Sequence, residues 1–231
     1  MVLADRSPDW LADFIDRHLK HQFGIAAWPL ARALVRLGAI PRPDVPEYAT
    51  LMPNGVTWHA HEGNAQVQTP LQALRADAGL LEDEIWRLFT VPEAGKALAD
   101  IDGRHEWLEE AGCVKPRDTW ATALAELSAD GRIDRDRLLD ACLGAFTRDF
   151  HPKRVSWYAG LLELLEPTTA EIAARMQTYL GLLAANSKSG VTVAQHRART
   201  LLEADLLDPS AFLTASAPLC RSRKRASLSH S

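Results

Sequence analysis

The sequence predicts an all-α protein made of antiparallel helix pairs, and three observations predict it. Apolar side chains recur every three or four residues through successive segments of about 10 to 16 residues. Serine, threonine or aspartate precedes many of these segments, often with proline next, as at Ser7-Pro8 and Thr69-Pro70. No strand pattern separates consecutive helical segments, so a parallel sheet is excluded. Helices in this order fit pairs stacked as a HEAT-like α-solenoid.

Residues 1–40 are predicted to form an N-terminal helical pair. Ser7 is the expected cap of the first helix, and Gly24 is expected to end that segment. The second helix is expected to start near Pro29, because proline is favoured at the first helical position. Gly38 is expected to close it, since glycine adopts the left-handed conformation that ends many helices.

Residues 41–68 are predicted to be an irregular, proline-rich loop with no helical period. Four prolines interrupt the segment: Pro41, Pro43, Pro46 and Pro53. Apolar and polar residues alternate from Val56 to His61, and residues 62–64 could turn the chain into residues 65–68. A short β-hairpin over residues 56–68 is therefore the one candidate for β structure.

Residues 69–217 are predicted to form a helical-repeat domain. One helix is expected over residues 81–89, with Glu82, Asp83 and Glu84 in its first turn. Asp134 is the expected cap of a later helix, and Cys142 lies in the apolar stripe of that helix as a small core residue. No exact repeat period is visible, so the solenoid prediction depends on the order and length of the helices.

Residues 218–231 are predicted to be a disordered basic tail. The whole chain has a formal charge of −4, and four of its basic residues lie within residues 221–225. Without them the chain has 22 basic residues against 30 acidic ones. Without those four residues the chain is acidic, so it has no general attraction to the phosphates of nucleic acids.

The composition is that of a globular protein outside the membrane. Hydrophobic residues make up 47% and charged residues 24% of the chain. No apolar run reaches the roughly 18 to 20 residues that a membrane-spanning helix needs. The N-terminal residues lack the apolar stretch of a secretory signal. We therefore expect a cytoplasmic protein.

Two segments carry a resemblance to a known family. They run from Thr69 to Asp77 and from Gly79 to Phe89, and the likeness covers roughly residues 45–217. These segments resemble a family of large bacterial proteins of unknown function with HEAT-like helical repeats, and the alanine- and arginine-rich style resembles actinobacterial proteins. The resemblance implies a helical-repeat fold and assigns no activity or catalytic residue. Family members continue with further helices where this chain turns basic after Pro218, so the resemblance implies a truncated member.

The strongest candidate for chemistry is His59-Ala60-His61-Glu62. On an extended strand, side chains two positions apart point the same way, so both imidazoles could bind one metal ion. Because no further strands are predicted to supply more ligands, surface histidines of a loop are the stronger interpretation. Trp58, in the same segment, is the tryptophan most expected to be exposed and is the candidate for contacting a partner.

Two other polar groups invite a functional interpretation and have a simpler one. His18 and His21 lie three residues apart on a predicted helix, where a solvated face is the simpler account. The segment 134–137 reads Asp-Arg-Asp-Arg and resembles a charged site. Helix capping by Asp134 and a favourable first-turn position for Asp136 are the stronger explanation.

The sequence favours binding over catalysis. No phosphate-binding loop, dinucleotide fingerprint, GxSxG or HExxH motif occurs. No catalytic residue and no cofactor is predicted. We expect a protein–protein interaction or scaffold module whose partner is another protein. Two alternatives stay open: a nucleic-acid-associated HEAT-like protein with a continuous Lys/Arg stripe, and a metal-dependent enzyme at residues 59–62.

Overall fold

The computed structural model describes residues 6–21, 24–57, 69–110, 119–148, 152–184 and 188–216. Within these ranges every regular element is a helix and no residue is in a strand. The prediction of an all-α protein is therefore confirmed. The chain divides into two compact units, residues 1–127 and 128–231.

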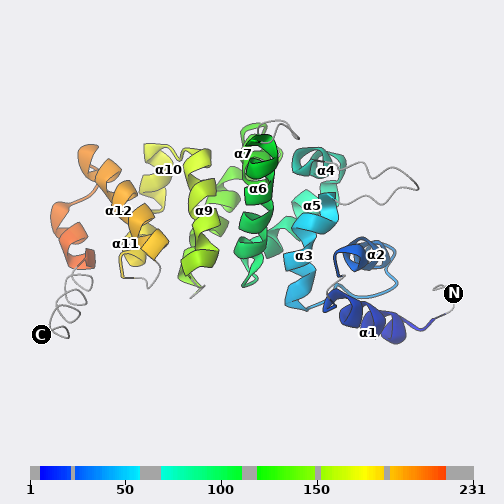
Figure 1. Cartoon of the computed structure of the whole chain (residues 1–231). Helices are drawn as coiled ribbons and strands as arrows, with labels where there is room; N and C mark the ends of the chain where they lie inside the picture. The colour runs from blue at the N-terminus through cyan, green and yellow to red at the C-terminus, as the bar shows by residue number, and fades with distance from the viewer. Residues whose placement is uncertain are drawn as a thin grey trace, which may run out of the picture. The chain divides into compact units, whose positions relative to one another are not determined.

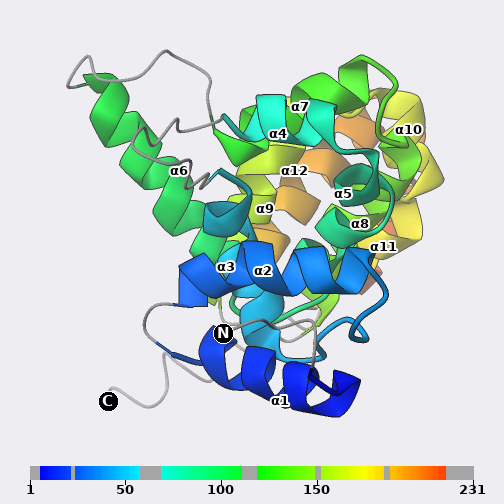
Figure 2. The ribbon, with the colours of Figure 1, turned by 90° about the vertical axis from the view of Figure 1, so that its right-hand side faces the viewer.

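In the first unit, several short and medium helices surround α3. The elements are α1 (Pro8–Leu19), α2 (Gly24–Arg36), α3 (Pro46–Thr57), α4 (Pro70–Ala76), α5 (Ala78–Glu82), the 3-10 helix η2 (Glu84–Phe89) and α6 (Ala94–Glu110) (Figure 1). Helix α3 packs against α1, α2, α4, α6 and η2. Figure 2 turns this unit toward the viewer, with α1 and α2 in blue. Helix α7 (Trp120–Ala129) begins in this unit and crosses the boundary.

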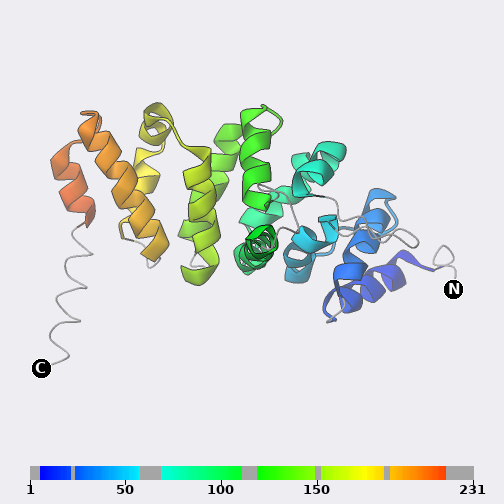
Figure 3. The ribbon, with the colours of Figure 1, turned by 45° about the horizontal axis from the view of Figure 1, so that its top comes forward.

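In the second unit, α12 (Lys188–Glu203) packs against three other helices. These are α9 (Pro152–Leu165), α10 (Thr169–Ala174) and α11 (Met176–Leu182), and α8 (Arg135–Thr147) packs against α9 and α11. Figure 3 shows α9 and α12 side by side. Residues 209–216 form one more helix. The core of the unit includes Leu143, Tyr158, Leu162 and Leu201, each at most 1% exposed.

Helix ends lie where local side chains can satisfy the free backbone groups. The Ser7 hydroxyl accepts a hydrogen bond from the backbone N–H of Trp10 at 3.3 Å. Thr69 and Gln72 form a reciprocal capping box at the start of α4. Gly38 closes α2 with φ = +68°, a conformation that suits glycine because it lacks Cβ. The predicted caps at Ser7 and Thr69 and the predicted end at Gly38 are confirmed.

The prediction of an irregular loop over residues 41–68 is wrong for residues 46–57, which form α3. Pro46 occupies the first helical position, where its missing N–H costs nothing. Tyr48, Met52 and Val56, four residues apart, are all buried, which is the period of a helix. Pro53 lies inside the helix, so packing against α1, α2, α4, α6 and η2 outweighs the cost of an interior proline.

The predicted β-hairpin is likewise not borne out. Val56 and Thr57, the first two residues of its expected first strand, end α3 instead. The Thr57 hydroxyl donates to the carbonyls of Pro53 and Asn54, as side chains at a helix end often do. Residues 58–68 lie outside the described residues.

Two helical boundaries differ from the predicted ones. Helix α2 begins at Gly24 rather than near Pro29, which lies within it. The helix expected over residues 81–89 is two short helices, because Asp83 leaves the helical conformation at φ = −130°. The helical run after Pro167 is also divided, at Arg175, into α10 and α11. Within the described ranges, no helix combines the length and the hydrophobicity that crossing a membrane requires.

Candidate functional site

A half-open pocket of about 310 Å³ lies among α2, α3, α4 and α5 in the first unit. Its wall is mostly apolar and includes Trp28, Val56, Ala76 and Leu80. The charged residues that line it are Arg32, Arg36 and Asp77. We call it the Trp28 pocket.

Trp28 is fixed in place by both polar and steric contacts. Its indole Nε1 donates a hydrogen bond to the backbone carbonyl of Tyr48 at 2.8 Å, and its ring centroid is 5.9 Å from that of Tyr48. A Cβ on Gly55 would lie only 2.6 Å from Trp28 Cε3, so α3 can approach the indole only with glycine at this position. These contacts position Trp28 at the wall of the pocket.

Asp77 lies between two guanidinium groups at the edge of the pocket. Its Oδ2 accepts from Arg32 Nη1 at 2.7 Å and from Arg36 Nη1 at 3.2 Å. Its Oδ1 accepts from the backbone N–H of Leu80 and so caps α5. The hydrogen bond from Arg32 is the main reason that the pKa of Asp77 is lowered, so this carboxylate is ionised at neutral pH.

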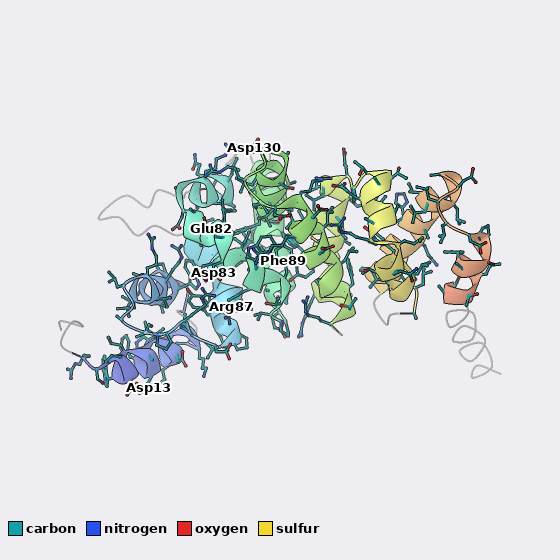
Figure 4. The ribbon with its side chains drawn as sticks, turned by 180° about the vertical axis from the view of Figure 1, so that it is seen from behind. Asp13, Glu82, Asp83, Arg87, Phe89 and Asp130 are labelled. Atoms are coloured by element: carbon teal, nitrogen blue, oxygen red, sulfur yellow. The ribbon has the colours of Figure 1, made fainter. Side chains whose placement is uncertain are left out.

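A second cluster of ionic groups connects the segment before α3 to η2. Arg42 pairs with Asp83 and lies 3.6 Å from Glu84, measured from Nε to Oε1. The Tyr48 hydroxyl donates to Glu84 Oε1 at 3.3 Å, and burial is the main reason that the pKa of Tyr48 is raised. Arg87 lies 3.5 Å from Asp44. Figure 4 labels Asp83, which directly precedes η2, and Arg87, which lies within it. These contacts connect Asp83 and η2 to α3 and to the segment before it.

A second pocket, of about 450 Å³, lies between α1 and α2. Phe14, Ile15 and Leu30 supply much of its apolar wall, and His18 and His21 also line it. His18 Nδ1 lies 2.7 Å from the carbonyl of Phe14, and its ring packs on the Phe14 ring at 3.8 Å. His18 is thus held by its own helix.

In the second unit, the segment 134–137 joins α8 to α10 and α11. Asp134 accepts from the backbone N–H of Arg137 at 2.9 Å and caps α8, which confirms the predicted cap. Arg135 Nε donates to Glu171 at 2.6 Å, and Arg175 Nη2 donates to Asp136 at 2.7 Å. The predicted charged segment is therefore a structural link between helices.

Comparison with known proteins gives one finding. Residues 1–226 match the model of a family described as a domain of unknown function, DUF6493. The chain belongs to this family. No curated protein and no solved structure was found to be similar. The DUF6493 match covers nearly the whole chain, whereas the resemblance in the sequence was expected over residues 45–217.

The site residues predicted from the sequence lie outside the described part of this DUF6493 chain. These are the metal candidates His59, His61 and Glu62 and the partner-contact candidate Trp58. They stay predictions. In the ranges that the structure describes, no group of three or more His, Cys, Asp or Glu side chains could hold a metal ion.

Cys142 occupies the core of the second unit of the DUF6493 chain. It is 0% exposed, and burial raises the pKa of its thiol. A thiol that stays protonated and buried is a poor nucleophile. The interpretation of Cys142 as a core residue is confirmed.

Sequence reasoning missed the Trp28 pocket. Its lining comes from residues between 28 and 80, and the prediction treated two of the contributing helices, α2 and α3, as a later-starting helix and a loop. One signal was available: Tyr48, Met52 and Val56 follow a four-residue spacing through the proline-rich segment. That spacing indicates a helix whose apolar face must meet a neighbour.

Proposed function

We propose that this chain is an interaction module of the cytoplasm that binds another protein, with its helix pairs stacked as a HEAT-like solenoid. The observation that carries the proposal is the Trp28 pocket. It is open on one side, mostly apolar, and walled by a tryptophan that is hydrogen-bonded to the Tyr48 carbonyl and lies close against Gly55. Concave apolar sites with a few fixed polar groups are typical of binding sites.

The size of the Trp28 pocket favours a side chain of a partner over a large cofactor. Ligand pockets span about 300 to 1,000 Å³, and a pocket of about 310 Å³ is at the low end of that range. Tryptophan and arginine are also the residue types in which binding energy at protein interfaces is concentrated. Arg36 brings one of these residue types to the pocket, where its side chain is 65% exposed, and the buried Trp28 supplies part of the wall.

Ion pairing across the chain supports a protein partner over nucleic acid. Many arginines of the described ranges are paired with carboxylates: Arg17, Arg32, Arg42, Arg75, Arg87, Arg135, Arg175, Arg197 and Arg199. A guanidinium whose charge is balanced by a neighbouring carboxylate attracts phosphate less strongly. The nucleic-acid alternative requires a continuous stripe of Lys and Arg that these pairs would interrupt.

Photo-crosslinking in the source cells tests the proposal. Ala76 is exposed and lines the pocket, so p-benzoylphenylalanine at this position would lie at its mouth. We expect an adduct with one defined protein. Ala129, exposed at the end of α7, is the matched control position and should not give that adduct. The same adducts from both positions, or no protein adduct from Ala76, would contradict the proposal.

A further inference from the structure

The charges at the Trp28 pocket do not cancel. Two guanidinium groups, on Arg32 and Arg36, share the single carboxylate of Asp77, so the pocket has one positive charge in excess. Arg32 is 12% exposed in its side chain, and Asp77 is 20% exposed. Arg36 is 65% exposed and contacts Asp77 through Nη1 alone in the ion pairs at the pocket. The excess charge is therefore presented to solvent by Arg36.

Arg32 keeps the positive charge close to the apolar wall. Its guanidinium carbon lies 5.9 Å from the centroid of the Trp28 ring, within the range of a cation–π contact. The Asp77 carboxylate that it binds also caps α5, so both groups are held by the fold. Asp77 therefore links the exposed Arg36 to Arg32, whose guanidinium lies beside the Trp28 ring.

We propose that the Trp28 pocket binds a protein segment in which a large apolar side chain stands next to an aspartate or glutamate. The apolar side chain enters the pocket beside Trp28, and the neighbouring carboxylate pairs with the guanidinium of Arg36. A planar guanidinium can bind a carboxylate through two parallel N–H···O bonds, which gives geometric selectivity as well as attraction. This inference rests on the proposed function, because it assigns the partner's chemistry to the same pocket.

Selection from a peptide library tests the chemistry without a known partner. The full chain would be panned against phage-displayed random dodecapeptides, and enriched peptides would be synthesised with a fluorescein label. We expect enriched sequences with Phe, Trp, Leu or Met adjacent to Asp or Glu. Filling the pocket with Ala76→Trp should lower their affinity about tenfold or more, since hot-spot contacts of an anchor side chain are lost. Ala33 is a second exposed residue of the pocket wall. Ala33→Phe should lower the affinity in the same way if the effect of Ala76→Trp comes from filling the pocket.

A charge exchange tests the role of Arg36. Arg36→Glu should weaken binding of the acidic peptides about tenfold, because attraction becomes repulsion at the rim. The same variant should bind peptides in which the acidic residue is replaced by lysine better than the wild-type chain does. Arg17→Glu is the matched control, since Arg17 is 66% exposed on α1 and does not line the pocket. It should leave affinity within about twofold.

The outcomes separate this inference from the proposed function. Enrichment of basic or uncharged peptides, or equal binding of acidic peptides to the wild-type chain and to Arg36→Glu, would overturn the inference. The inference would also be overturned if the library yielded no peptide whose binding is weakened by Ala76→Trp. A defined crosslink from Ala76 in cells would still support a protein partner in those cases. If Ala76 gave no crosslink in cells while acidic peptides still bound through the pocket, only the proposed function would be contradicted.

Discussion

The carboxylate of Asp102 accepts a hydrogen bond from the backbone N–H of Trp120 at 2.8 Å, across an interval of 18 residues. Its second oxygen accepts from the N–H of Ala121 at 3.2 Å. Trp120 and Ala121 are the first two residues of α7, whose free N–H groups carry the positive end of the helix dipole. A buried side chain of α6 thus caps the start of α7.

We expect Asp102→Ala to destabilise the first unit by about 2 to 3 kcal/mol, because two backbone N–H groups lose their acceptor in a buried site. Asp102→Asn keeps one acceptor oxygen and should cost about 1 kcal/mol. Urea-induced unfolding followed by far-UV circular dichroism measures both.

The matched control for these variants is Asp100→Ala. Asp100 is exposed on the same helix and pairs only with Lys96, one turn away, in the described contacts of its carboxylate. Its loss should change the free energy of unfolding by less than about 0.5 kcal/mol. Equal effects of the substitutions at positions 100 and 102 would argue against the capping role of Asp102.

Gly55→Ala should destabilise the first unit by about 1 to 3 kcal/mol, since the new methyl group would overlap the Trp28 ring. The displaced indole would also weaken the hydrogen bond to the Tyr48 carbonyl. A thermal melt and the near-UV circular dichroism signal of the tryptophans report the two effects.

Gly160→Ala, also inside a helix, should change stability in the opposite direction from Gly55→Ala. Gly160 lies inside α9, and a Cβ built on it meets no atom within 4 Å. The substitution should stabilise the second unit by about 0.5 to 1 kcal/mol, because alanine has the higher helix propensity. A stabilising Gly55→Ala would show that Trp28 can move away from α3.

The pair between Glu171 and Arg135 should make stability depend on pH. The hydrogen bond from Arg135 is the main cause that lowers the pKa of Glu171 from 4.5 to about 2. A carboxyl group whose pKa falls on folding stabilises the protein above its unfolded pKa and loses that effect as the pH falls toward its folded pKa. Glu171→Gln should therefore cost about 1 to 2 kcal/mol at pH 7.

Urea unfolding of the wild type and of Glu171→Gln across the acidic range checks this expectation. Their difference should shrink as the pH falls from 4.5 toward 2, where the wild-type carboxylate gains its proton. Glu203→Gln, in an exposed pair with Arg199, should have little effect at any pH. A constant difference between wild type and Glu171→Gln from pH 7 to the lowest pH would contradict the assignment.

Cys142 should resist alkylation in the folded protein. Iodoacetamide reacts with the thiolate, and burial both raises the pKa of this thiol and blocks access to it. Peptide mass spectrometry should find Cys142 unmodified under native conditions and fully modified in urea. Rapid native modification at this position would require an open second unit.

The predicted ends of several helices follow from residues close together in the chain. Ser7, Thr69 and Asp134 each cap a helix by accepting a hydrogen bond from an N–H three residues later. Gly38 ends α2 through its own backbone conformation. Such interactions need no distant partner, so the local sequence is enough to predict them.

Residues that need a distant partner were predicted less well. The sequence does predict that Asp136 is favourable in the first turn of α8. Its pair with Arg175, which lies 39 residues away, could not be predicted in this way. Asp83, at the break between α5 and η2, likewise pairs with Arg42, which lies 41 residues away in the sequence. Local patterns contain no information on which of several charged residues will meet.

The sequence by itself determined that the chain is helical, where many of its helices are capped, and that Cys142 belongs to a core. Only the tertiary structure decided that Pro46 and Pro53 lie within a helix and that Trp28, Arg36 and Asp77 share one pocket. The physical reason is the distance along the chain over which each interaction acts. Apolar period and capping act within a few residues, whereas burial of Tyr48 and Met52 against neighbouring helices overrides the local preference of proline.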